Sequence, residues 1–238
     1  MRRLLISSSA IAILAGFLAT PSASAQYATV TEPQTLTLYL GGFLPTREGS
    51  RDVNDVLLQN EQFLAFRIQD FDFTTFGGEW LFPIGHNFEG GAGVGYFQRT
   101  VPSTYLNLVN SNGAEITQTL QLRIVPFTAT LRVLPFGTHA PIKPYFGGGV
   151  AVYYWHYNES GQWVDADNNI FLGSFTGSGG AVGPVVLGGV RAPVGMLDLG
   201  FEVRWQGGEG TLPTDQGFAG TKIELSGMNY LFTVGIKF

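Results

Sequence analysis

The chain of 238 residues carries 13 basic and 18 acidic residues, a formal charge of −5, and contains no cysteine. The lack of cysteine excludes a disulfide framework and a thiolate metal site, and no basic patch points to nucleic acid. Only 13% of the residues are charged whereas 45% are hydrophobic, which is about half the charged share typical of a soluble domain. Such a chain either encloses an unusually large core or presents apolar surface to lipid.

The first 25 residues have the pattern of an export signal. Arg2 and Arg3 precede an apolar stretch at 4–18 and the small-residue sequence Ala-Ser-Ala at 23–25, which is typical of a cleavage site. We expect cleavage before Gln26, since the apolar stretch is short for the alternative, an uncleaved inner-membrane anchor. Cleavage removes two basic residues and changes the formal charge from −5 to −7.

Membrane-crossing strands are predicted after a short periplasmic segment at 26–34. No later run of 18 apolar residues could form a spanning helix, whereas a strand crosses in about 9 to 11 residues with apolar groups outward and polar groups inward. The first such strand, 35–44, points its leucines outward, and a second, 74–82, points Phe76, Trp80 and Phe82 outward and Glu79 inward. A third strand is predicted at 88–99, with Phe88 and Val94 outward and Glu89, three glycines and Arg99 inward.

The middle of the chain is harder to interpret. In the predicted strand 117–134, Leu120, Leu122 and Ile124 define one register and Phe127 and Leu131 define the other. A proline, at 126, lies at the change, which predicts a β-bulge there. The next strand, 144–157, is aromatic on both faces, so its phase stays open.

Three further strands complete the pattern. The first, 180–192, places its valines outward and Arg191 inward, and the second, 197–206, alternates most clearly, with Phe201 and Trp205 opposite Glu202 and Arg204. The last strand ends the chain with alternating apolar residues: Tyr230, Phe232, Val234, Ile236 and Phe238.

The connections alternate in length, as in membrane barrels. Long segments at 45–72, 100–116, 158–179 and 207–220 alternate with short ones at 83–87, 135–143 and 193–196. We therefore predict an all-β fold over 35–238, a closed eight-stranded antiparallel up-and-down transmembrane β-barrel with short periplasmic turns and long outer loops. A soluble barrel of the lipocalin kind would have the reverse arrangement, with apolar residues inside.

The export signal, the alternating strands and the terminal sequence from Tyr230 to Phe238 resemble the small outer-membrane barrels of the OmpA, OmpX and OmpW type. The resemblance implies an outer-membrane location, contact with lipid and lipopolysaccharide, and recognition of the C-terminal strand by the barrel-assembly machinery. We expect a monomer that binds no nucleic acid. Because the sequence ends at Phe238, we expect no peptidoglycan-binding domain of the kind that follows the OmpA barrel.

Charged side chains of both signs are predicted to face the barrel axis. The predicted interior charges are Glu79, Glu89, Arg99, Arg123, Arg132, Arg191, Asp198, Glu202, Arg204 and Lys237. Because eight strands leave room for little more than their own side chains, we expect these groups to pair and block the interior. The alternative is a narrow polar path for small solutes.

No catalytic site, cofactor site or metal site is predicted. His156 near Glu159, Ser160 and Asp165 could supply the groups for acyl transfer in a lipid A-modifying enzyme, but a polar histidine at a loop edge is the simpler interpretation. Asp165, with nearby acids and amides at 167–169, could bind calcium, but the EF-hand pattern is incomplete and a solvated loop is the simpler interpretation.

The longest outer segment, 45–72, contains apolar clusters at 56–58 and 63–66. We expect them to cover the barrel mouth as a short amphipathic helix, with lipid headgroup contact as the alternative. Two functions follow from the sequence. The first is a structural or surface-interaction barrel with a plugged interior, and the second is a narrow channel or transporter for small solutes, apolar ones included.

Overall fold

The computed structural model describes residues 33–165 and 167–238, so the predicted export signal and most of the predicted periplasmic segment lie outside the described residues. Within them, no helix is long and apolar enough to cross a bilayer. The ring strands are β1 (Thr35–Pro45), β2 (Phe73–Pro83), β3 (Phe88–Val109), β4 (Glu115–Val133), β5 (Lys143–Val164), β6 (Ile170–Val194), β7 (Leu197–Gln206) and β10 (Gly227–Lys237). The smaller elements are η2 (Glu48–Ser50), α1 (Val56–Asn60), η3 (Ile68–Phe71), β8 (Glu209–Thr211) and β9 (Lys222–Glu224).

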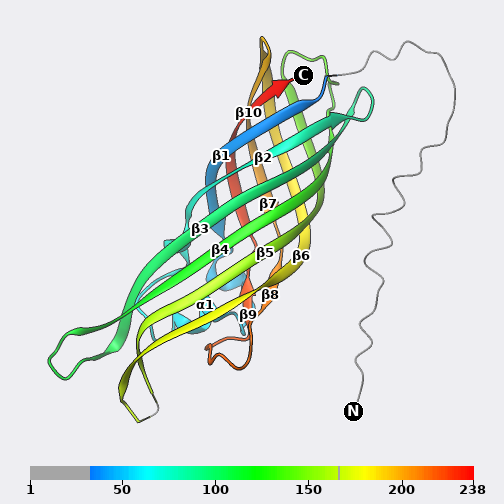
Figure 1. Ribbon diagram of the computed structural model, residues 1–238. Coiled ribbons are helices and arrows are strands. Elements are labelled where there is room, and N and C mark those ends of the chain that lie inside the picture. Colours follow the sequence, from blue (N-terminus) through cyan, green and yellow to red (C-terminus); the bar gives the residue numbers. More distant parts are fainter. Residues whose placement is uncertain (1–32, 166) are drawn as a thin grey trace, which may run out of the picture. The chain divides into compact units, whose positions relative to one another are not determined.

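The eight long strands form a closed antiparallel barrel in the order β1, β10, β7, β6, β5, β4, β3, β2 (Figure 1). Closure is made by β1, which pairs with β2 on one side and with β10 on the other. A closed ring leaves no backbone amide of an edge strand unpaired, which is the condition for crossing hydrocarbon. The predicted fold class is confirmed.

The strands have two lengths, and this difference was not predicted. β1, β2, β7 and β10 have 10 or 11 residues, enough for one crossing. β3 to β6 have 19 to 25 residues and extend well past their neighbours at the end away from the C-terminus (Figure 1). The segments 100–116 and 158–179, predicted as loops, are therefore mostly strand, and that prediction was wrong.

The polarity of the long strand β4 reverses along its length while its pleat continues unchanged. In β4, Thr128, Thr130 and Arg132 face inward in the first part, where Phe127 and Leu131 are exposed outside. Further from the turns, the same inward face carries leucines and isoleucine at 116, 120, 122 and 124, and the outward face carries threonine, glutamine and arginine at 119, 121 and 123. The first arrangement suits lipid outside and the second suits water outside.

This reversal corrects two interpretations of the middle strands. Pairing of β4 with β5 runs without a break through Pro126 and Tyr153, so the predicted bulge at Pro126 does not exist. The apolar run changes sides because the surroundings change, not because a residue is inserted. In β5, the inward face carries Tyr145, Tyr153, Trp155 and Tyr157, which explains why aromatic residues occur on both faces of that strand.

A belt of exposed apolar side chains surrounds the part of the barrel next to the short turns. The most exposed members include Phe232 and Val182, each with 70% of its surface accessible. The belt includes Leu36, Leu38, Leu40, Phe76, Trp80, Phe127, Leu131, Phe146, Val150, Val186, Val190, Leu199, Trp205, Val234 and Ile236. A contiguous apolar surface of this extent is far beyond what a soluble monomer exposes.

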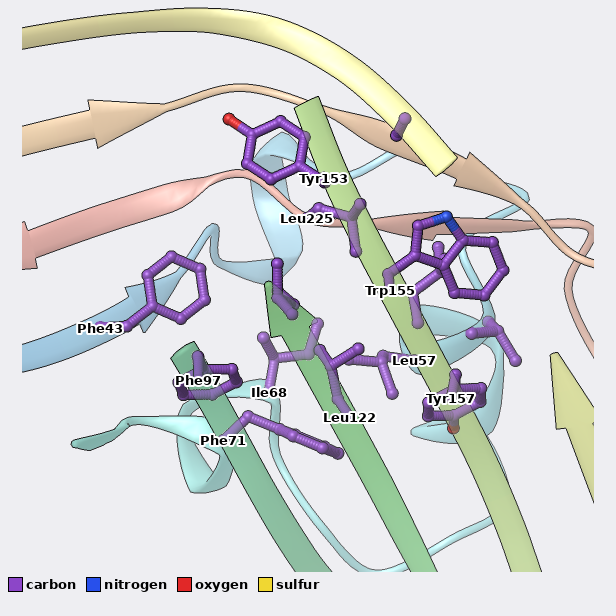
Figure 2. Close-up of a cluster of buried hydrophobic side chains, with 14 of the residues drawn as sticks. Phe43, Leu57, Ile68, Phe71, Phe97, Leu122, Tyr153, Trp155, Tyr157 and Leu225 are labelled. Carbon is purple, nitrogen blue, oxygen red and sulfur yellow. The ribbon is translucent and has the colours of Figure 1, made fainter. Parts of the chain in front are cut away.

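The remaining part, which we call the outer half, consists of 97–124 and 153–179 with the connecting segments 46–72 and 207–226. Its core is apolar and is closed by the segment 46–72, which we call the lid. Leu57, Ile68 and Phe71 of the lid are fully buried and point toward Phe97 of β3 and Leu122 of β4 (Figure 2). The prediction that this segment covers the barrel mouth with a short helix is confirmed, since α1 lies within it.

Candidate functional site

Four charged side chains meet at the centre of the barrel segment that the apolar belt surrounds. We call this segment the lower barrel; it is the end with the C-terminus, at the top of Figure 1. Arg132 of β4 pairs with Glu79 of β2 and, at 3.0 Å, with Glu202 of β7. Arg204 pairs with the same two carboxylates, at 3.1 Å from Glu79 and 2.7 Å from Glu202. Each arginine thus contacts both acids, and the four side chains are at most 5% exposed. We call this group the charge quartet.

Neighbouring side chains add hydrogen bonds and ring contacts to the quartet. Thr130 donates to Glu79 at 3.1 Å and Tyr145 donates to Glu202 at 2.9 Å. The guanidinium of Arg132 lies 4.9 Å from the ring centre of Tyr145, and that of Arg204 lies 5.4 Å from the ring centre of Tyr39. Buried charges are tolerated when they are paired in this way.

A second group of charges lies closer to the short turns. Arg191 of β6 donates to both oxygens of Glu89 at 2.7 Å. Asp198 lies 2.9 Å from Lys237 and 3.9 Å from Lys143. Together with the quartet, these pairs fill the axis from the turns to the middle of the barrel.

Inward glycines give these long side chains their room. A Cβ atom at Gly91 would lie 2.6 Å from an oxygen of Glu79 and 2.6 Å from the hydroxyl of Thr130. At Gly77 it would lie 2.4 Å from the hydroxyl of Tyr39. The lower barrel is therefore packed with side chains to the point where a methyl group does not fit.

The structure places eight of the ten predicted interior charges inside the lower barrel, one on the inward face of β3 at the barrel mouth, and one on the outward face of β4, which is a correction. Arg123 shares the outward face of β4 with Val125 and Phe127, because the pleat does not change phase at Pro126. Arg99 lies at the barrel mouth, where it donates to the backbone oxygen of Asp70 at 3.0 Å and stacks on a phenylalanine ring. Lys143 was missed, because the sequence placed it in a turn rather than at the start of β5.

A buried ion pair within the lid is hydrogen-bonded to the backbone of β9, in the connecting segment 207–226. Arg51 and Asp55 pair at 2.8 Å and neither side chain is exposed. Asp55 also caps α1 by accepting from Leu57 at 3.1 Å, and it accepts from the backbone nitrogen of Glu224 in β9 at 2.7 Å. Arg51 donates to the backbone oxygen of Glu224 at 3.2 Å. We call these contacts the latch.

A pocket of about 430 Å³ lies in the outer half, between the lid and the strands β3, β5 and β6. This volume is within the usual range for small-molecule sites. Five aromatic side chains line it: Phe63 from the lid, Tyr105 from β3, Trp163 from β5, and Phe171 and Phe175 from β6. Its charged lining residues, Glu159 and Asp165, are both acidic.

The floor of the pocket carries buried polar atoms. Glu159 is 2% exposed, and its oxygen Oε1 accepts from the amide of Asn60 at 2.5 Å and from the hydroxyl of Tyr157 at 2.9 Å. The amide oxygen of Asn60 and the indole nitrogen of Trp163 are buried without a hydrogen-bond partner among the described residues. Burial raises the pKa of Glu159 above its ordinary value, and the hydrogen bonds from Asn60 and Tyr157 offset only part of this increase.

The groups considered for catalysis or calcium binding are not brought together. His156 lies opposite Arg123 on the outward face of β5, whereas Glu159 faces inward. Asp165 accepts from the backbone nitrogens of Asp167 at 2.9 Å and Asn169 at 2.8 Å and so closes the tip of a hairpin. Within 33–165 and 167–238, no three histidine or acidic residues form a group that could hold a metal ion.

The alternating residues of the C-terminal strand lie on its outward face. In β10, Tyr230, Phe232, Val234 and Ile236 are between 42% and 70% exposed, and Phe238 is 69% exposed directly after the strand. β10 pairs with β1 and β7, so its backbone closes the ring.

No family model matches the sequence, and no curated protein matches it. Among solved structures, the N-terminal β-barrel domain of Pseudomonas aeruginosa OprF covers 87% of this chain and 100% of its own, with 9% identity and a TM-score of 0.38. The match to Ail, the attachment invasion locus protein of Yersinia pestis, covers 87% of this chain and 98% of Ail, with 8% identity and a TM-score of 0.41. Neisserial surface protein A covers 87% and 97% with 13% identity and a TM-score of 0.41. The strand pairing itself shows the fold of this chain, a closed eight-stranded antiparallel barrel, which is the fold that its resemblance to small outer-membrane barrels implied.

Proposed function

We propose that this chain is a bacterial outer-membrane protein that conducts no solute and holds a folded outer half at the cell surface for interactions there. The support for a membrane location is the apolar belt around the lower barrel, combined with an interior that carries the charges. Hydrocarbon is the surrounding in which this arrangement is stable. Outer-membrane lipid and lipopolysaccharide are the proposed neighbours of the belt, and the barrel is proposed to act as a monomer.

The blocked axis is the observation that carries this proposal. A channel needs a continuous water path, whereas here the charge quartet fills the lower barrel and the lid closes the mouth above it. The lid residues Leu57, Ile68 and Phe71 are at most 1% exposed, so apolar side chains of the described chain cover the outer end of the lower barrel.

Conductance in planar bilayers tests the proposal. The purified full chain should show no stable open level, whereas a trimeric porin inserted under the same conditions provides the positive control. A reproducible open level in the unmodified protein would contradict the proposal and support the narrow channel instead.

We further propose that the protein is not an enzyme. His156 and Glu159 lie on opposite faces of β5, which separates the base from the acid that acyl transfer would need. His156→Ala should therefore leave lipid A acylation in the host membrane unchanged, and a loss of acylation in this variant would overturn the proposal.

The C-terminal residues are proposed to be read by the barrel-assembly machinery. Phe238 follows β10, and its backbone pairs with that of Gln34. Its side chain is 69% exposed, so replacing this side chain should cost the folded barrel little. Phe238→Ala should lower the amount of protein in the outer membrane while in vitro folding into vesicles stays unchanged. Equal losses in both assays would show a structural role only.

A further inference from the structure

The pocket in the outer half has a chemistry that the proposed function does not explain. Its wall is aromatic, its two charged residues are acids, and its lining contains no lysine, arginine or histidine. Aromatic faces carry negative charge density and attract cations, most strongly when water is excluded. The carboxylate of Glu159 would repel an anionic ligand, and a purely apolar ligand would leave this carboxylate buried without a counter-ion.

We propose that this pocket binds a small organic cation, a quaternary or alkylated ammonium with a hydroxyl or similar polar group, and that Glu159 is its counter-ion. The proposal goes beyond the proposed function and relies on it only for an outer half that faces water.

The geometry around the carboxylate fits this role. Both donors, the amide of Asn60 and the hydroxyl of Tyr157, bind the same oxygen, Oε1, which leaves Oε2 for a ligand. Across the neighbouring strands, Glu159 is opposite Leu120 of β4 and Phe175 of β6, neither of which carries a charge. No basic side chain of these strands or of α1 competes with a bound cation for the carboxylate.

The aromatic side chains are arranged on several sides of the pocket. The rings of Trp163 and Phe175 pack edge to face with centroids 5.2 Å apart, and those of Phe63 and Tyr105 lie 5.9 Å apart. The hydroxyl of Tyr105 accepts from the backbone nitrogen of Val164 at 3.2 Å, which ties β3 to the tip of β5. Aromatic side chains from the lid and three strands thus surround the pocket, and an aromatic cage is the usual recognition surface for alkylated ammonium groups.

The two unpartnered buried atoms indicate a polar group on the ligand. The amide oxygen of Asn60 can accept a hydrogen bond, and the indole nitrogen of Trp163 can donate one. Buried polar atoms normally have a partner. A hydroxyl, which donates and accepts, satisfies either or both of them.

The rim of the pocket allows entry from outside. Phe171 is 43% exposed, and Gly217 and Ala219 at the rim are also exposed, whereas Asn60 and Glu159 form the buried floor. Ala219 therefore offers a position at which a large side chain closes the pocket without entering the core.

Calorimetric titration of the folded full chain with choline tests the proposal. The protein is kept in a maltoside detergent, because detergents with choline or amine-oxide headgroups would compete for the site. The uncharged analogue of choline, in which a carbon atom replaces the nitrogen, is the matched ligand control. We expect saturable binding of choline and binding of the analogue that is weaker by about tenfold or more.

Three variants locate the site. Glu159→Gln keeps an acceptor for Asn60 and Tyr157 but removes the charge, and should weaken choline binding by about tenfold or more. Ala219→Trp should abolish binding by occupying the pocket, and Glu115→Gln, which removes an exposed acid of the outer half, should leave it unchanged. Heat-modifiable gel migration identifies folded protein in each case.

The proposal is overturned if choline shows no saturable binding, if its uncharged analogue binds equally well, or if binding survives in Ala219→Trp. If Glu159→Gln does not fold, Ala219→Trp still decides the matter, because Ala219 contributes nothing to the core. None of these results depends on conductance, so failure of this proposal is distinguishable from failure of the proposed function.

Discussion

Replacing Arg132 by methionine tests whether the charge quartet holds the barrel together. Methionine is unbranched like the stem of arginine and only somewhat smaller, so the change removes the charge with little loss of volume. Glu79 and Glu202 would then share Arg204 as their partner, with one uncompensated negative charge in the buried group. Removing one partner of a buried ion pair typically costs about 3–5 kcal/mol.

We expect a value near the lower end, about 3 kcal/mol, because Arg204 stays within 3.1 Å of both carboxylates. The double variant Arg132→Met with Glu79→Gln restores neutrality and keeps the pair between Arg204 and Glu202. It should therefore be more stable than the single variant by about 1–2 kcal/mol, which is coupling of the size seen between residues in contact.

Urea unfolding in lipid vesicles, followed by tryptophan fluorescence and gel migration, measures these free energies. Arg123→Met is the matched control, since it makes the same change on the outward face of the same strand and should cost less than about 0.5 kcal/mol. Equal costs for the two arginine variants, or a double variant less stable than the single one, would refute the reasoning.

Three other predictions follow from the lid, the reversal of polarity and the pocket. Asp55→Ala leaves the latch arginine buried without its partner, so the lid should lose hydrogen-exchange protection and become open to protease. Glu48→Ala, at an exposed position of the lid, should change neither. Ala129→Arg, in the middle of the apolar belt, should destabilise the barrel in vesicles by about 2–4 kcal/mol, whereas Thr119→Arg, on the same face further out, should cost less than about 0.5 kcal/mol; equal costs would rule out the reversal. The pKa of Glu159 is raised in the folded protein, so the free energy of unfolding that Glu159 contributes should fall as the pH rises from the ordinary pKa of a glutamate to the raised pKa. Urea unfolding between about pH 4 and pH 8 should show this decrease in the unmodified protein and not in Glu159→Gln. The same pH dependence in both proteins would contradict the prediction.

The barrel could be predicted from the sequence because lipid imposes a simple rule on short strands. In 197–206 and 229–238, every second residue is apolar and the others, apart from Leu231, are polar or glycine, so each strand indicates its own orientation. The strand count and the position of the turns follow from the same alternation. Eight of the ten predicted interior charges lie on the axis for this reason.

The rule fails where the strands leave the hydrocarbon. From Ile124 toward Glu115, the inward face of β4 is mostly apolar and the outward face is polar. A rule that always places apolar residues outward therefore requires a phase change at this point, and the backbone does not make one. This is why Arg123 was placed inside and why the phase of β5 stayed open. A second rule for water-exposed strands would have found the continuation, since the alternation itself never breaks.

The pocket could not be predicted at all. Asn60 and Glu159 are 99 positions apart in the sequence, and only the fold of the lid over the mouth brings them together. The latch is similar, because Asp55 and Glu224 meet only after the ring has closed. Single polar residues within apolar segments gave no sign of these contacts.

The reversal of polarity also fixes the depth at which the barrel sits in its bilayer. A shift outward along the membrane normal would lift the lower leucines and phenylalanines into water, and a shift inward would draw Gln121 and Arg123 into hydrocarbon. Both displacements carry a penalty, so the protein has one preferred immersion depth. Bilayers of different thickness should therefore stretch or thin around this barrel instead of letting it slide.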